Sequence, residues 1–159
     1  MPTERSRDRG AALVAAQALA LAALAWPGAP RWRLPRPATA LAVATGAAGT
    51  VLLEEGLRFL GGDLTPFVEP RSDARLRTTG PYAFSRNPVY AGLLAAAAGA
   101  AVLRRRPEPL AAAAALAGVL HVKAGAEERR LRERFGFAYA EYAARTPRLL
   151  ALPRPGRGA

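Results

Sequence analysis

The chain has 159 residues, no cysteine, a single histidine and a formal net charge of +11. This composition excludes disulfide bonds and cysteine nucleophiles, and a lone histidine without clustered carboxylates argues against a transition-metal site. A charge of +11 would suggest nucleic acid as the partner of a soluble protein. Here the basic residues flank long apolar segments, so we expect membrane lipids with anionic headgroups as partners and no nucleic acid.

Four segments lack charged residues altogether: 10–30, 37–53, 87–103 and 109–120. A membrane-spanning helix needs about 20 mostly apolar residues; the first segment has them, the second nearly does, and the last two are shorter. The sequence therefore predicts an all-α, multi-pass transmembrane bundle of about four helices, in which the last two either cross with little tilt or form a short hairpin. The first segment is followed by further apolar ones, which indicates a retained anchor rather than a signal peptide.

In chain order, we expect helices over residues 10–27, 38–60, 88–103 and 110–135, and a cytoplasmic amphipathic helix over 137–144. The prolines between residues 27 and 37 interrupt the first pair of helices, and Gly136 interrupts the last pair. The long segment 61–87 is expected to be a functional loop, since loops of this length are uncommon in compact domains. We expect three units: a tail with two membrane helices in 1–60, a second module in 61–153 and a disordered tail in 154–159.

The basic residues are unevenly divided between the two ends of this bundle. The N-terminal segment, the segment 58–86 and the segment from Lys123 onward carry 17 of the 23 lysines and arginines, and would lie at one end. The positive-inside rule places that end, and with it both termini, in the cytoplasm. Six arginines, three of them at 104–106, fall at the other end and oppose this assignment. They would fit it better if the last two helices form a shallow hairpin.

The segment 80–92 is a polar turn that runs directly into an apolar helix. Asn87 is a good N-cap residue, because its side-chain oxygen can accept from the free amides of the first turn, and Pro88 suits the first helical position. A helix start of this kind favours an anion, and Arg86 and Tyr82 would add a cation and an aromatic face. The segment therefore predicts a small-molecule site at the end of a membrane helix.

The fourth helix carries a polar stripe at three- and four-residue spacing: His121, Gly125, Glu128, Arg132 and Phe135. Lys123 and Glu127 form a second pair four residues apart. Taken alone, these charges are typical of a solvated helix with intrahelical ion pairs. On the same grounds, we interpret Tyr139 and Tyr142 as aromatic anchors at the membrane interface.

The order and spacing of several short motifs point further. The motifs are Leu76-Arg77-Thr78-Thr79-Gly80-Pro81-Tyr82, Ser85-Arg86-Asn87-Pro88-Val89-Tyr90-Ala91-Gly92, Glu127-Glu128, Leu131, Phe135-Gly136, Tyr139, Tyr142 and Pro147-Arg148. Together they make the stretch from about Leu76 to Pro153 resemble the isoprenylcysteine carboxyl methyltransferase family and its bacterial and phospholipid-methyltransferase relatives. This resemblance covers about half of the chain.

The resemblance implies a bacterial inner-membrane methyltransferase that binds S-adenosylmethionine at the cytoplasmic surface, with 61–153 as the cofactor-binding module and a lipophilic or lipidated acceptor. The cofactor-binding residues expected from the resemblance and the residue chemistry are Arg75, Leu76, Arg77, Tyr82, Arg86, Asn87, Pro88, Val89, Tyr90 and Glu127. Lys123 and Glu128 are expected to contact the acceptor. No metal is expected, and no catalytic nucleophile is assigned. Eukaryotic members have histidine where this chain has Asn87, which puts a carboxylate acceptor in doubt.

Three alternatives remain open on the sequence. Sterol reductases of membranes share a distantly similar C-terminal module and would use NADPH in place of S-adenosylmethionine. A protein that kept the fold without activity, or a basic membrane-surface adaptor, would need no cofactor. The chemical group that accepts the methyl, whether carboxylate, amine, thiol or hydroxyl, is also left open.

Overall fold

The structure is a computed structural model that describes residues 4–61 and 76–149. Every regular element in these residues is helical, which confirms the predicted all-α class. The elements are α1 (Glu4–Ala25), α2 (Arg36–Leu60), the short 3₁₀ helix η2 (Gly80–Ala83), α3 (Pro88–Arg104) and α4 (Pro107–Arg145). The predicted cofactor residue Arg75 and the predicted tail 154–159 lie outside the described residues.

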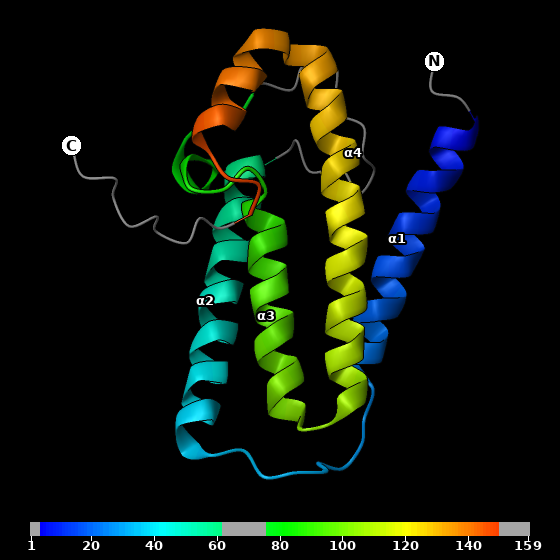
Figure 1. The fold of residues 1–159 in the computed structure, drawn as a ribbon, viewed down its shortest axis with the longest axis vertical. Coiled ribbons are helices and arrows are strands. Elements are labelled where there is room, and N and C mark those ends of the chain that lie inside the picture. Colours follow the sequence, from blue (N-terminus) through cyan, green and yellow to red (C-terminus); the bar gives the residue numbers. More distant parts are fainter. Residues whose placement is uncertain (1–3, 62–75, 150–159) are drawn as a thin grey trace, which may run out of the picture.

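The four α-helices run alternately up and down and form one bundle (Figure 1). The start of α1, the end of α2, η2 and the C-terminal turns of α4 lie at one end, which is the upper end in the figure. The α1–α2 connector and the α3–α4 turn lie at the opposite end. The structure therefore groups the described segments at the two ends as the sequence predicted, while the orientation of the bundle in a membrane stays a prediction.

Helices α2 and α3 pack most closely in the bundle, because glycines of the two helices face each other across their interface. A Cβ atom at Gly92 would lie 2.7 Å from the carbonyl oxygen of Gly49, and one at Gly99 would lie 2.7 Å from the amide nitrogen of Gly46. Only glycine allows the two backbones to approach this closely. Small residues at an interface are the usual means by which helices pack in lipid, where apolar side chains gain little by leaving the bilayer.

Helices α2 and α4 are long and apolar enough to cross a membrane, whereas Gly10–Ala25 and Pro88–Arg104 are shorter apolar helices. The sequence had favoured the first helix as a span and the fourth as a short one. The apolar part of α1 is shorter than predicted because the helix ends at Ala25, ahead of Pro27. Helix α4 is longer than predicted because it continues through the polar residues after Leu120. The faces turned outward from the bundle remain apolar: Leu19, Leu41, Val43, Val51 and Val122 are exposed.

The turn between α3 and α4 is fastened to the connector between α1 and α2. The guanidinium of Arg106 donates to the carbonyl oxygens of Trp26 at 2.7 Å and Pro27 at 3.1 Å, and the amide of Arg31 donates to the carbonyl of Arg105. The α3–α4 pair therefore extends to the same level as α1 and α2. Whether α3 and α4 form a shallow hairpin in the membrane, which would explain the arginines at 104–106, stays a prediction.

Helix α4 bends sharply at Gly136, whose φ of +50° is left-handed and suits glycine. Its last turns fold back over the upper end of α2 and α3 (Figure 1). This reversal buries Tyr139 and Tyr142, which the sequence analysis interpreted as interfacial anchors. That interpretation is wrong, since both rings pack inside the protein and stand edge to face with centroids 6.1 Å apart.

Candidate functional site

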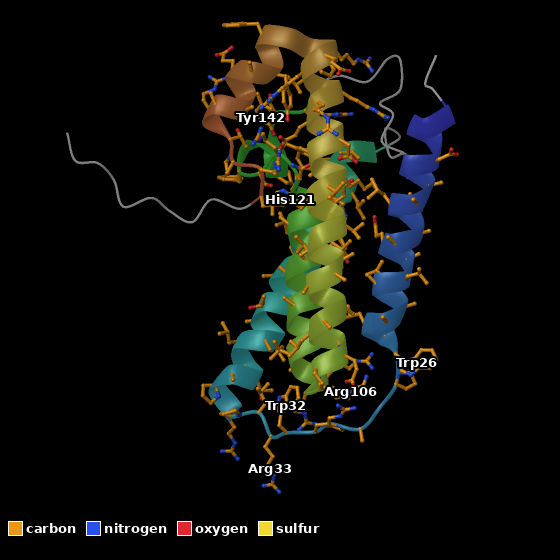
Figure 2. All side chains as sticks on the ribbon, turned by 45° about the vertical axis from the view of Figure 1, so that its right-hand side comes forward. Trp26, Trp32, Arg33, Arg106, His121 and Tyr142 are labelled. Atoms are coloured by element: carbon orange, nitrogen blue, oxygen red, sulfur yellow. The ribbon has the colours of Figure 1, made fainter. Side chains whose placement is uncertain are left out.

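The turn before α3 is held by buried polar groups. The hydroxyl of Tyr142 donates to the carbonyl oxygen of Tyr82 at 2.6 Å, and the fully buried hydroxyl of Ser85 accepts from the amide of Asn87 at 3.1 Å. Tyr142 lies at the upper end of the molecule in Figure 2. The turn is thus fixed from two sides, by its own serine and by the folded-back end of α4.

Asn87 occupies the N-cap position of α3, as predicted, but its side chain makes no capping hydrogen bond. Its Nδ2 instead donates to the carbonyl oxygen of Arg148 at 2.9 Å, and the neighbouring amide of Arg86 donates to the carbonyl of Pro147 at 2.8 Å. The predicted side-chain cap is therefore wrong. The Nδ2 group thus donates to a carbonyl 61 residues away, and Asn87 joins the turn to the C-terminal segment.

The first turn of α3 lies against α2. Pro88 is fully buried, and a Cβ atom at Gly56 would come within 3.1 Å of the amide nitrogen of Val89. Gly56 is thus the residue that lets α2 approach the helix start. One side of this start is covered by α2.

Next to the helix start, four polar side chains from three helices meet. The hydroxyl of Tyr90 in α3 donates to Glu127 of α4 at 2.5 Å, and the ammonium of Lys123 stands 5.6 Å from the centre of the Tyr90 ring. The same ammonium donates to the side-chain oxygen of Gln17 in α1 at 3.3 Å. Lys123 is only 7% exposed. We call Gln17, Tyr90, Lys123 and Glu127 the polar cluster.

Glu128, the neighbour of Glu127, belongs to a separate arrangement. Its two carboxylate oxygens accept from Nε and Nη2 of Arg148 at 2.9 and 2.8 Å, and Arg86 lies 3.5 Å away on the other side. Glu128 is 4% exposed. This bidentate pair, together with the backbone contacts of Pro147 and Arg148, fastens the end of the described chain onto α4 and the turn. We call it the C-terminal latch.

Electrostatics at this end follow from burial and from these pairs. Burial raises the pKa of the Tyr82 hydroxyl, and the nearby Arg77 guanidinium opposes that rise only weakly, so Tyr82 stays protonated at physiological pH. The hydrogen bond to Glu128 raises the pKa of Arg148 further above its ordinary value. The latch therefore keeps its cation at any pH at which the protein is studied.

Three buried polar atoms at this end have no hydrogen-bond partner within the described parts of the chain. They are Nε of Arg86, Nη1 of Arg130 and the hydroxyl of Tyr139, and the guanidinium of Arg86 lies beside that hydroxyl. Buried donors without partners are uncommon, because each costs the free energy of its lost hydration. Two of the three belong to guanidinium groups, so the end of the bundle that holds the polar cluster also holds hydrogen-bond donors suited to an anion.

The predicted site residues are divided by the structure. Tyr90, Lys123 and Glu127 meet in the polar cluster, while Glu128 belongs to the C-terminal latch and Arg86 and Asn87 contact it. Leu76 is half-buried and Arg77 exposed. The stripe predicted on the fourth helix is split, since Glu128 is buried whereas His121 and Arg132 are exposed.

Sequence reasoning missed one functional residue and undervalued two others. Gln17 was overlooked because it lies in an alanine-rich segment, although it is the lone polar residue between Gly10 and Trp26. Ser85 and Tyr142 were noted as parts of motifs but not as the groups that fix the turn. A polar residue within an otherwise apolar membrane helix was the signal that could have identified Gln17.

A sequence model of the phospholipid methyltransferase family matches residues 37–138, more than half of the chain. Comparisons with curated proteins and with solved structures gave no significant match. The matched residues include α2, α3 and most of α4. Gln17 and Arg148, which contact Lys123 and Glu128, lie on either side of them.

Proposed function

Because the chain belongs to the phospholipid methyltransferase family, we propose that it transfers a methyl group from S-adenosylmethionine to a lipophilic or membrane-embedded acceptor. Membership of this family supports the general statement that the chain is a membrane methyltransferase. The methyl donor, the class of acceptor and the residues that bind them are the proposal.

The observation that carries the proposal is the contact of Glu127 with Tyr90 beside Lys123. S-adenosylmethionine presents an ammonium, a carboxylate, an adenine and a cationic sulfonium. The carboxylate of Glu127 suits the ammonium, and the unpartnered guanidinium nitrogens of Arg86 and Arg130 suit the carboxylate, since charge-assisted hydrogen bonds are the strong ones. The donor set at this end of the bundle thus fits the cofactor.

The remaining predicted cofactor residues complete the proposed site from the turn and the first turn of α3. Tyr82 offers an aromatic face for the adenine or the sulfonium. Tyr90 offers at most one face, because the ammonium of Lys123 stands over its ring. The residues that we propose to line the site are Arg75, Leu76, Arg77, Tyr82, Arg86, Asn87, Pro88, Val89, Tyr90 and Glu127.

When bound, the cofactor supplies a methyl group that is activated by a positive sulfur. The chain's own task is then to position the acceptor in line with that group and to exclude water, which needs neither a nucleophile nor a metal. Apolar outward faces on the helices allow a lipophilic acceptor to approach from within the bilayer. We propose that Lys123, oriented by Gln17, meets the polar part of the acceptor. Glu128 is already engaged by Arg148 and Arg86.

Replacing Glu127 with glutamine is expected to weaken S-adenosylmethionine binding about ten- to a hundredfold. Glutamine still accepts the hydrogen bond of Tyr90 but carries no charge, and a hydrogen bond between charged groups contributes roughly 1.5–3 kcal/mol. Isothermal titration of detergent-purified protein measures the affinity. The matched control is Glu133→Gln, which removes an exposed charge from the same helix and should leave the affinity unchanged.

An equal, small loss of S-adenosylmethionine affinity in both variants would mean that Glu127 does not contact the cofactor. Activity is tested directly by incubating membranes that contain the protein with S-adenosylmethionine carrying a labelled methyl group, followed by extraction of lipids. Label in the lipid fraction supports the proposal. Binding of NADPH in place of S-adenosylmethionine would favour the reductase alternative.

We further propose that the end carrying the polar cluster faces the cytoplasm, where the cofactor is made, in a bacterial inner membrane. The chain has no cysteine, so single cysteines report without background. In intact cells, a membrane-impermeant maleimide is expected to label Ala29→Cys, in the connector at the far end, and not Ala144→Cys, both being exposed positions. The opposite labelling pattern would separate the proposed site from its cofactor supply.

A further inference from the structure

The end of the bundle opposite the polar cluster is strongly basic. Among the described residues it carries one carboxylate, Glu108, and six arginines: Arg31, Arg33, Arg36, Arg104, Arg105 and Arg106. Figure 2 shows Arg33 and Arg106 at this end together with Trp26 and Trp32. Such a concentration of charge opposes the positive-inside rule if this end faces outward, so its retention needs a physical reason.

Half of these arginines have structural partners. Arg31 forms an ion pair with Glu108, Arg104 donates to the carbonyl of Trp26 at 3.2 Å, and Arg106 holds the carbonyls of Trp26 and Pro27. Arg106 is buried, and a Cβ atom at Gly28 would displace its guanidinium. Arg31, Arg104 and Arg106 thus hold the α3–α4 turn against the α1–α2 connector.

The other three have no such role. Within residues 4–61 and 76–149, no hydrogen bond or ion pair engages the side chains of Arg33, Arg36 or Arg105. The backbone hydrogen bond from the amide of Arg31 to the carbonyl of Arg105 joins the connector to the turn, so Arg33 and Arg36 lie at the same end of the bundle as Arg105. Like charges gathered at one end of a bundle repel each other, and a bound anion relieves that repulsion.

The surroundings of these arginines belong to a membrane interface. Trp26 is 70% exposed and Trp32 39% exposed, and tryptophan concentrates at the level of lipid headgroups. Exposed Leu41 on α2 and Leu103 on α3 lie a short way along their helices from Arg36 and Arg105. The surface thus combines cations for a phosphate with apolar side chains for an acyl chain.

We propose that Arg33, Arg36 and Arg105 form a binding site for the phosphate of an anionic phospholipid, in the leaflet opposite the polar cluster. The neighbouring tryptophans and leucines favour a lipid over a soluble anion. The site is independent of the methyl transfer proposed above.

The two tryptophans of the chain both lie at this end, so quenching of their fluorescence reports on it alone. In a Trp26→Phe background, Trp32 becomes the single reporter beside Arg33. Detergent-solubilised protein is titrated with phosphatidylglycerol or phosphatidylcholine carrying brominated acyl chains, which quench on contact. We expect half-maximal quenching at a concentration of phosphatidylglycerol about fivefold lower or more, since one basic residue near an anionic surface contributes about 1 kcal/mol.

The preference should disappear in the triple variant Arg33→Gln/Arg36→Gln/Arg105→Gln, and Arg33→Gln alone should reduce it. It should persist in Arg129→Gln/Arg132→Gln/Arg145→Gln, which removes three exposed charges from the other end. Equal quenching by both lipids, or a preference that survives the first triple variant, overturns the proposal.

Discussion

Replacing Gly92 with leucine is expected to lower the free energy of unfolding by about 3 kcal/mol, at the upper end of the cost of overpacking a core. The new side chain would meet backbone atoms of Gly49 and Leu53 in α2, which cannot rotate away as a side chain can. The two helices would have to separate along their length. Unfolding of the detergent-solubilised protein with increasing sodium dodecyl sulfate, followed by circular dichroism, measures the loss.

The matched control is Gly118→Leu. Gly118 lies in the apolar part of α4, is exposed and has no atom near its missing side chain. Leucine there should change stability by less than about 0.5 kcal/mol, as exposed substitutions usually do. Similar losses at both positions would mean that helix propensity or detergent, rather than the α2–α3 contact, sets the stability.

Replacing Glu128 with alanine is expected to cost about 1.5–3 kcal/mol, because it removes the bidentate hydrogen bonds of the partly exposed Arg148 and leaves the largely buried Arg86 without its counter-charge. The latch would loosen, and with it the turn that the latch holds through Asn87. We therefore expect weaker cofactor binding as a second, indirect effect. The same unfolding measurement gives the stability change.

A double-mutant cycle separates the latch from other roles of Glu128. If the pair acts as a unit, Arg148→Ala together with Glu128→Ala should cost much less than the sum of the two single changes. Additive costs would show that the two side chains contribute independently. Glu133→Ala, five residues along the same helix and exposed, should be nearly neutral.

The helices and their order could be predicted from the sequence because charge-free segments and prolines mark them directly. Asn87 shows where this reasoning fails. Its residue type and position made a side-chain cap the natural expectation, yet the side chain contacts the carbonyl of Arg148. Local chemistry gives the position of the helix start but not the distant group that the Asn87 side chain contacts.

The two adjacent glutamates illustrate the same limit. Glu127 and Glu128 have nearly identical sequence surroundings, and no periodicity argument separates them. In the structure, Glu127 accepts a hydrogen bond from Tyr90, whereas Glu128 accepts from Arg148. The two carboxylates have different partners because successive residues of a helix point about 100° apart. Arg148 reaches Glu128 only because the chain reverses direction at Gly136. The sequence predicted that the helix is interrupted at this glycine but not the direction that the chain takes after it.

The bend at Gly136 also limits how the length of the chain can vary. After this glycine, the last turns of α4 fold back and Arg148 reaches Glu128 on the earlier part of the same helix, so the number of intervening residues is set by the distance that must be spanned. One inserted residue in the turns after Gly136 would rotate the later side chains by about 100° and carry Tyr142 away from the carbonyl of Tyr82. Proteins that share this architecture should therefore keep a constant spacing from Gly136 to Arg148.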